Sequence, residues 1–321
     1  MGDLFKAISG GLARFVFAWM TPSVVALGLF ALYVLPGVSD TWLLAPVTQP
    51  SRESGVTAAL IFAFFVLVSS VLFAYASLPI YQVLEGYRLP AAVRRRLRRR
   101  HLKEFHRLRA LERRYRATGV FPAGYTTDDL RLRYPRDVNS VRPTRLGNAL
   151  TSMEQWSSSR FQLDSQTMWF ELQAVSPDNV RKDVDEGRAP VDFFVSSIAH
   201  ASLLSVSGII VGSFTAQRQA LVIGLLAACT IPLSYRLAVS NTLDWSQSVK
   251  AMVNVGRVDL AQRLGLQMPD TLQEERHMWS AHLHVIELAD DAHVESYDSY
   301  RVSVPKEKPS AWYRLRRTIG G

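Results

Sequence analysis

The sequence has a single cysteine and, over long stretches, no charge at all. The lone Cys229 excludes a scaffold held together by disulfides. A hydrophobic content of 48% excludes an intrinsically disordered chain. The 25 residues Val56–Ile80 contain no charged side chain. Buried helices of soluble proteins seldom run that long without a charge, so a simple soluble enzyme is disfavoured.

The motifs of common catalytic and metal sites are also missing. The chain has no glycine-rich phosphate loop with its lysine, no GxSxG, no HExxH and no Cys-x-x-Cys pair. The closest approach to a ligand set is His277, His282, His284 and His293. However, His282 and His284 would point to different sides of a helix. We therefore expect no enzyme activity, no catalytic residue, no metal site and no cofactor.

What the chain does contain is apolar stretches of membrane-spanning length. A helix needs about 20 apolar residues to cross the roughly 30 Å hydrocarbon core of a bilayer. Four stretches reach or approach that length, at residues 15–36, 56–80, 193–214 and 220–236. The fourth is short, and the long side chain of Arg236 can extend it to the membrane surface. The sequence therefore predicts an all-α membrane protein with two transmembrane hairpins, 1–80 and 193–236.

The positive charge is concentrated in one place. The net charge of the chain is +9. The segment from Arg88 to Arg116 holds 13 Lys and Arg residues and only two acids, so the rest of the chain is slightly acidic. Because loops rich in Lys and Arg stay in the cytoplasm, residues 81–192 are predicted to be cytoplasmic. An even number of spans then places both termini on that side.

The regions outside the spans predict a mostly helical cytoplasmic domain. It would combine the loop domain 81–192 with a C-terminal helical region and basic tail, 237–321. Pro90 and Gly119 are start and stop signals for a basic helix over 90–118. Further along, Thr271 opens a capping-box pattern. The alternation in 293–304 permits a short strand.

The basic helix is amphipathic, and three interpretations of it compete. It could lie over anionic lipid, pair with acids of the same or a neighbouring subunit, or bind a soluble polyanion such as nucleic acid or a nucleotide. Its position just inside the membrane favours lipid. The scarcity of aromatic residues and of any nucleic-acid module disfavours nucleic acid. The expected contact residues are Arg94, Arg95, Arg96, Arg98, Arg99, Arg100, Arg107 and Arg109.

The third span carries a polar face and a small-residue motif. Ser196, Ser197, His200 and Ser207 lie on one side of the predicted helix. These side chains either tie helices together or line a polar pathway, because exposure of an ionisable group to lipid is costly. The adjacent Gly208 and Gly212 form a GxxxG spacing, which lets two helix backbones approach closely.

Short motifs outside the spans carry a resemblance to a known group. Arg142–Asn148 reads Arg-Pro-Thr-Arg-Leu-Gly-Asn and is followed by Glu154 and Trp169, while Val258–Gly265 and Trp279 follow the fourth span. With these motifs the chain resembles a group of bacterial, largely actinobacterial, four-span membrane proteins. The resemblance covers most of the chain. It implies the topology and a bacterial inner membrane, and it implies no activity.

Three functions fit these features. Four spans are too few for the usual two-repeat transporter, so a pathway would need several subunits around an axis. The first hypothesis is therefore a homo-oligomeric pore or channel-like assembly controlled by the cytoplasmic domain. The second is a membrane scaffold that recruits a cytoplasmic protein partner without transport. The third is a membrane-tethered binder of nucleic acid or nucleotide.

Overall fold

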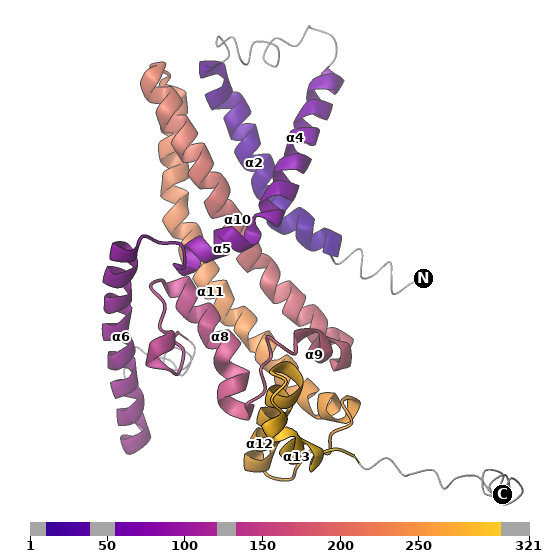
Figure 1. Cartoon of the computed structure of the whole chain (residues 1–321). Coiled ribbons are helices and arrows are strands. Elements are labelled where there is room, and N and C mark those ends of the chain that lie inside the picture. Colours follow the sequence, from indigo (N-terminus) through magenta and orange to yellow (C-terminus); the bar gives the residue numbers. More distant parts are fainter. Residues whose placement is uncertain (1–10, 39–54, 121–132, 303–321) are drawn as a thin grey trace, which may run out of the picture. The chain divides into compact units, whose positions relative to one another are not determined.

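The computed structural model describes residues 11–38, 55–120 and 133–302. The connector between the first two spans, the loop that contains Asp128 and Asp129 (two acids available to pair with the basic helix) and the basic tail lie outside them. All the regular elements in the described part of the chain are helical (Figure 1). Four helices are long and apolar enough to cross a membrane. The prediction of an all-α chain with four such helices is confirmed.

The short strand that the alternation in 293–304 permits does not form in its described part, 293–302. Asp291–His293 form a 3-10 turn, η6, and Val294–Asp298 form helix α13. The carboxylate of Asp290 accepts a hydrogen bond from the Ala292 amide, and this cap favours a helical turn over an extended start. A single antiparallel bridge joins Leu266 with Arg301.

The first apolar helix covers Gly11–Gly37 and contains two wide turns. It comprises η1 (Val16–Met20), α2 (Thr21–Leu29), η2 (Phe30–Val34) and η3 (Leu35–Gly37), of which η1 and η2 are π-helical. Each π turn ends two residues before a proline, Pro22 or Pro36. Proline has no N–H to donate, and a π turn adjusts the hydrogen-bond ladder at that point. The helix therefore stays continuous past both prolines.

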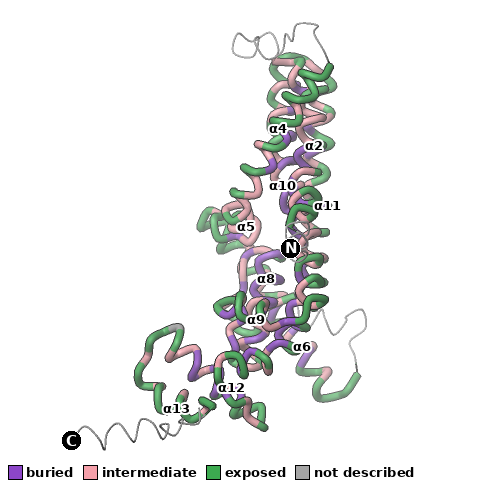
Figure 2. The backbone as a smooth tube through the Cα atoms, turned by 90° about the vertical axis from the view of Figure 1, so that its right-hand side faces the viewer, coloured by how far each residue is buried: buried purple, intermediate pink, exposed green. Residues whose placement is uncertain are grey.

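The second apolar helix, α4, spans Gly55–Tyr75 and ends before the predicted limit of Ile80. The chain breaks at Ala76 and continues as α5, Ser77–Glu85, which stops at Gly86 with a left-handed φ of +92°. Most of α4 is exposed, whereas buried residues gather where the first helix meets α10, Asp178–Phe214 (Figure 2). α4 therefore presents most of its apolar surface to the exterior.

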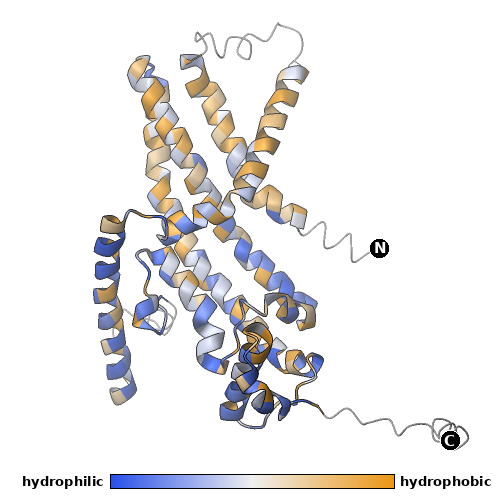
Figure 3. Cartoon of the chain, in the orientation of Figure 1, coloured by the Kyte–Doolittle hydropathy of each residue, from blue (hydrophilic) through white to orange (hydrophobic). Residues whose placement is uncertain are grey.

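Helices α10 and α11 extend well beyond the apolar runs that identified them. α10 begins at Asp178, and α11 covers Arg218–Arg263. The apolar residues of α10 occupy the half that ends at Phe214, and its first turns are hydrophilic (Figure 3). The sequence predicted only the spans 193–214 and 220–236 within these helices. Hydropathy marks the edge of the lipid and not the end of a helix, so each apolar run is one part of a longer helix.

The two helices of the second hairpin touch backbone to backbone. A Cβ added to Gly208 would lie 2.7 Å from the Ala220 carbonyl oxygen, and one added to Gly212 would lie 2.5 Å from the Leu221 nitrogen. On the opposing helix, a Cβ on Gly224 would lie 2.7 Å from the backbone of α10. Only glycine fits these positions without movement of the neighbouring helix, as in close small-residue packing in membranes.

The Pro-Thr-Arg-Leu-Gly-Asn motif forms the start of α8, Arg145–Phe161. The Thr144 hydroxyl accepts from the Gly147 amide at 3.0 Å, and the Asn148 side chain bonds the backbone of Arg142 and Thr144. A Cβ on Gly147 would lie 2.6 Å from the carbonyl oxygen of Glu85. The motif therefore caps a helix and lets it approach the end of α5 closely.

The chain divides into two compact units. The first comprises Met1–Trp156 and Pro177–Asn254 and holds the four apolar stretches, α5 and α6 (Ala91–Thr118). The second comprises Ser157–Ser176 and Val255–Gly321. It holds α9 (Trp169–Val175), α12 (Leu272–His282), η5 (Leu283–Glu287), η6 and α13. Thr271 caps α12 as its capping-box pattern predicts.

Candidate functional site

One side of α6 is fixed to the polypeptide that follows it. Phe105 and Leu108 are buried there, at 5% and 2% exposed. The Arg98 guanidinium donates to the carbonyl oxygens of Val141 at 2.9 Å and Asn139 at 3.1 Å. These contacts hold the helix against the segment that contains η4, Val138–Ser140.

A second set of bonds continues this attachment toward the end of the helix. His101 Nδ1 lies 2.8 Å from the Tyr134 hydroxyl, and Arg109 donates to the Pro135 carbonyl oxygen at 3.1 Å. Arg98 and Arg109, two of the expected contact residues, therefore lie on the docked side of α6. Their guanidinium groups serve the fold.

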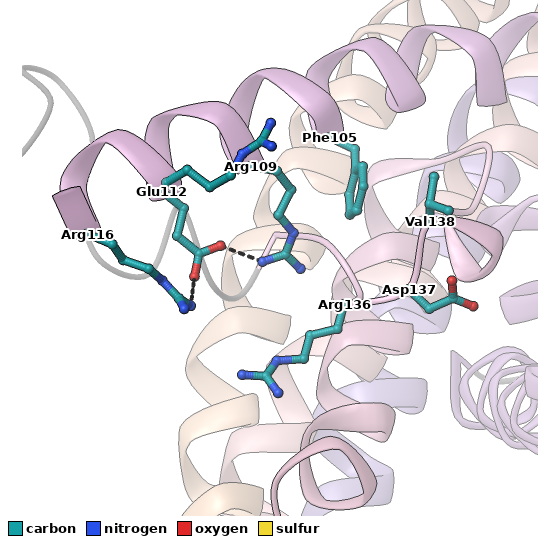
Figure 4. A pocket seen from close by; sticks show the side chains of 8 residues that line it. Phe105, Arg109, Glu112, Arg116, Arg136, Asp137 and Val138 are labelled. Atoms are coloured by element: carbon teal, nitrogen blue, oxygen red, sulfur yellow. Dashed lines mark hydrogen bonds and ion pairs between the residues drawn. The ribbon is translucent and has the colours of Figure 1, made fainter.

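A buried carboxylate reinforces the docked side. Glu112 is 8% exposed and accepts hydrogen bonds of 2.6 Å from both Arg109 and Arg116 (Figure 4). Burial by itself would raise the pKa of Glu112, but the hydrogen bonds and charges of the two arginines outweigh it and lower that pKa. Sequence reasoning missed Glu112. Its signal is the spacing of an acid three residues after one arginine and four before another.

The opposite side of α6 presents positive charge that the fold leaves unused. Seven of its exposed cations have side chains that make no hydrogen bond or ion pair with any residue in the described part of the chain. We call them the basic face: Arg95, Arg96, Arg99, Arg100, Lys103, Arg113 and Arg114. Of the other expected contact residues, Arg94 lies 3.5 Å from the Tyr87 carbonyl oxygen and Arg107 lies 3.7 Å from Glu104.

The basic face is a continuous strip along the helix. At 100° per residue the seven cations fall within an arc of about 140°, and at 1.5 Å per residue they extend over about 28 Å. Figure 3 shows that α6 is hydrophilic over nearly its whole length. Like charges held this close create a strong positive potential, which favours an anionic ligand.

A surface recess adjoins the basic face. Its volume is about 590 Å³, and its lining combines four arginines with two acids (Figure 4). The lining residues are Phe105, Arg109, Glu112, Arg113, Arg116, Arg136, Asp137 and Val138. Because Arg113 belongs to both features, the recess extends the positive surface around the side of the helix.

The polar residues of the third span lie in a helix contact. Ser196 is fully buried and His200 is 5% exposed. His200 Nε2 lies 2.9 Å from the Ser23 hydroxyl in α2, its Nδ1 lies 2.8 Å from the Ser196 carbonyl oxygen, and its ring is 4.0 Å from that of Phe73. The polar groups therefore connect the first helix, α4 and α10.

The two remaining serines of that face make only local bonds. Ser197 donates to the Phe193 carbonyl oxygen and Ser207 donates to that of Leu204, both within α10. The structure thus brings Ser196 and His200 together with Ser23 but leaves Ser197 and Ser207 apart. Sequence reasoning missed Ser23, whose signal is a hydroxyl inside an apolar run.

A buried ionic cluster lies on α10 on the N-terminal side of the contact between His200 and Ser23. Asp192 is 1% exposed, and its Oδ2 accepts from Arg14 Nη2 at 2.6 Å and Nε at 3.1 Å. Its Oδ1 accepts from the Tyr81 hydroxyl at 2.7 Å, and Arg188 Nε lies 3.5 Å from Oδ2. Arg188, Asp192, Ser196 and His200 follow at intervals of four residues, so they form one stripe along α10. The cluster joins the first helix, α5 and α10.

Among the described residues no three His, Cys, Asp or Glu side chains lie together as metal ligands. His284 and His293 stack at 4.4 Å, and His293 bonds the carboxylate of Asp290. The resemblance to four-span bacterial proteins stays a prediction. Comparison of the chain with protein-family models, with curated proteins and with solved structures gave no match.

Proposed function

We propose that the protein is a membrane-anchored scaffold that holds an anionic partner through the basic face of α6. The observation that carries this proposal is the row of seven exposed cations without a partner in the described chain, on the side of α6 opposite its docked side. The four apolar helices would be the anchor. The Lys and Arg bias favours the cytoplasmic side for α6, and the resemblance to four-span bacterial proteins implies a bacterial inner membrane.

The attachment of α6 supports a binding role. Arg98 and Arg109 fix the helix along its docked side through the carbonyl oxygens of Val141 and Pro135, so the basic face points outward in one defined orientation. A binding surface that is ordered before its partner arrives loses less conformational entropy when it binds. A loose arginine-rich segment would lack this advantage.

The packing of the third span favours a scaffold over a pore. A pore needs a polar face that points toward an axis between subunits. Here His200 and Ser196 are buried against the first helix, and Gly208 and Gly212 are in contact with α11 of the same chain. These residues therefore have partners within one chain, and anchoring explains them without any pathway.

The test uses the whole chain in discs of neutral phosphatidylcholine, with a fluorescent heparin oligosaccharide as the anionic probe. One variant neutralises four positions of the basic face, with the substitutions Arg95→Gln, Arg96→Gln, Arg99→Gln and Arg100→Gln. The matched control removes the same charge from exposed cations elsewhere, with Lys182→Gln, Arg218→Gln, Arg236→Gln and Arg263→Gln.

We expect the native chain and the control to retain heparin with affinities within about twofold, and the basic-face variant to lose at least tenfold. Equal losses in both variants, or no retention by the native chain, would overturn the proposal. Potassium flux in liposomes tests the pore hypothesis in parallel. Flux above that of protein-free liposomes, abolished by His200→Ala, would establish the pore and contradict a role limited to anchoring.

A further inference from the structure

We infer that the partner of the basic face is the phosphate backbone of double-stranded nucleic acid. This inference deepens the proposed scaffold function and rests on it. It follows from what the basic face contains, what it lacks and how far it extends from the apolar helices.

The composition of the basic face argues against an acidic protein as the partner. The arc that the seven cations occupy contains otherwise only Arg107 and the short or polar residues Ala92, His106, Ala110, Ala117 and Thr118. Stable protein interfaces have an apolar centre with aromatic anchors inside a polar rim. A surface with a charged centre and no such anchor matches a partner whose charge repeats along a backbone.

The same composition argues against a single strand. Proteins that hold single-stranded nucleic acid stack its bases on aromatic side chains, and each stacked base contributes about 1–3 kcal/mol. The arc of the basic face carries no Phe, Tyr or Trp. A duplex presents its phosphates outward and needs no stacking platform, so arginines alone can bind it.

The extent of α6 argues against a lipid surface. Its 28 residues make it about 42 Å long. Figure 1 shows it extending from the α5 end away from the apolar halves of the spans. Arg113 and Arg114 therefore lie about 33–35 Å along the helix from its start. Surface potentials decay within about 8–10 Å at physiological salt, so headgroups would engage only the first turns.

The dimensions of the basic face fit a duplex. B-form DNA carries one phosphate charge per 1.7 Å of axis, so a length of about 28 Å presents about 16 phosphates. That number exceeds the seven cations, so a duplex supplies more phosphate charge along this length than the basic face can neutralise. Contacts of this kind carry no base information, and we therefore expect binding that is independent of sequence.

The salt dependence of binding allows a quantitative prediction. Each neutralised phosphate contributes about −0.9 to the slope of log K against log salt concentration. Seven contacts give a slope of about −6, and the variant that retains three cations gives about −3. The matched control, which keeps the whole basic face, should keep the native slope.

The experiment measures anisotropy of a labelled 24-base-pair DNA duplex with the whole chain in neutral phosphatidylcholine discs. The salt concentration runs from 50 to 200 mM, and two unrelated duplex sequences, one single strand and the heparin probe are compared. We expect both duplexes to bind within about twofold of each other and the single strand at least fivefold more weakly. Arg113→Gln with Arg114→Gln, a milder second variant, should reduce the slope by about 2. Circular dichroism verifies that every variant retains its helix content.

The outcomes separate the two proposals. Heparin retained through the basic face without duplex binding would overturn the inference and leave the scaffold intact. If the native chain binds neither heparin nor the duplex, both the scaffold proposal and the duplex inference are overturned. Tighter binding of the single strand, or a slope that neither basic-face variant changes, would also overturn the duplex inference.

Discussion

The substitution Asp192→Asn keeps the size of a buried side chain and removes its charge. Both carboxylate oxygens of Asp192 accept hydrogen bonds, one from Arg14 and the other from Tyr81. An asparagine amide has one acceptor oxygen, and its NH2 group only donates. With the amide oxygen toward Arg14, the NH2 group faces the Tyr81 hydroxyl, which can accept instead of donate, so what the substitution removes is the negative charge of the ion pair.

The expected cost follows from the geometry of the cluster. Loss of one partner of a buried ion pair typically costs about 3–5 kcal/mol. The Arg14 side chain is 29% exposed, so water replaces part of the interaction. Arg188 Nε is buried without a hydrogen bond and depends on the charge of Asp192 and on the Trp245 ring, which lies 5.7 Å from the guanidinium carbon. We therefore expect Asp192→Asn to lower the free energy of unfolding by about 2–4 kcal/mol.

The assay is unfolding in mixed micelles of a mild detergent and sodium dodecyl sulfate, followed by helical circular dichroism. Asp185→Asn is the matched control, because Asp185 is an exposed carboxylate seven residues earlier in the same helix. The control should stay within about 0.5 kcal/mol of the native chain. An Asp192→Asn variant as stable as the control would refute the idea that this cluster joins the helices.

Three further substitutions test other parts of the fold in the same assay. Burial and the charge of Glu154 raise the pKa of Glu85 to about 7, so its contribution to stability is complete below about pH 4.5 and is lost as the pH rises through 7. Glu85→Gln should therefore stabilise the protein at pH 8 and change little at pH 4.5, and equal effects at both would contradict this. Gly208→Ala should cost about 1–3 kcal/mol, whereas Gly55→Ala, which meets no atom within 4 Å, should not destabilise. Thr271→Ala should cost about 1 kcal/mol by removing the cap of α12, and an unchanged exchange rate of the amides in its first turn would refute that.

The ends of the basic helix could be predicted because the residues that set them lie next to them in the sequence. Pro90 lies at its start, and Gly119 ends it with a φ of +69°, which glycine adopts without strain. The observed helix, Ala91–Thr118, agrees with these signals. Its docked side was predicted less well, because the charged residue Glu112 is buried there. A pattern of apolar residues does not anticipate a carboxylate that two arginines neutralise.

The contacts of the third span could not be predicted because their partners are distant in sequence. Arg14 and Asp192 are 178 positions apart, and Ser23 and His200 are 177 positions apart. The polar face of the span was visible, but periodicity alone does not reveal which helix covers it. The lengths of α10 and α11 were also underestimated. Both helices keep their backbone hydrogen bonds beyond the point where the sequence changes from apolar to hydrophilic, and hydropathy alone does not show this.

The stripe on α10 has a handedness that governs how the helices around it are arranged. Steps of four residues continue it beyond His200 through Leu204 and Gly208 to Gly212. Each step turns by about 40°, so from Asp192 to Gly212 the stripe winds about 200° around the helix while it rises about 30 Å. Its polar half therefore meets the first helix and its glycine half meets α11, on nearly opposite sides. A rotation of α10 about its own axis would therefore break its contacts with the first helix and with α11 at the same time.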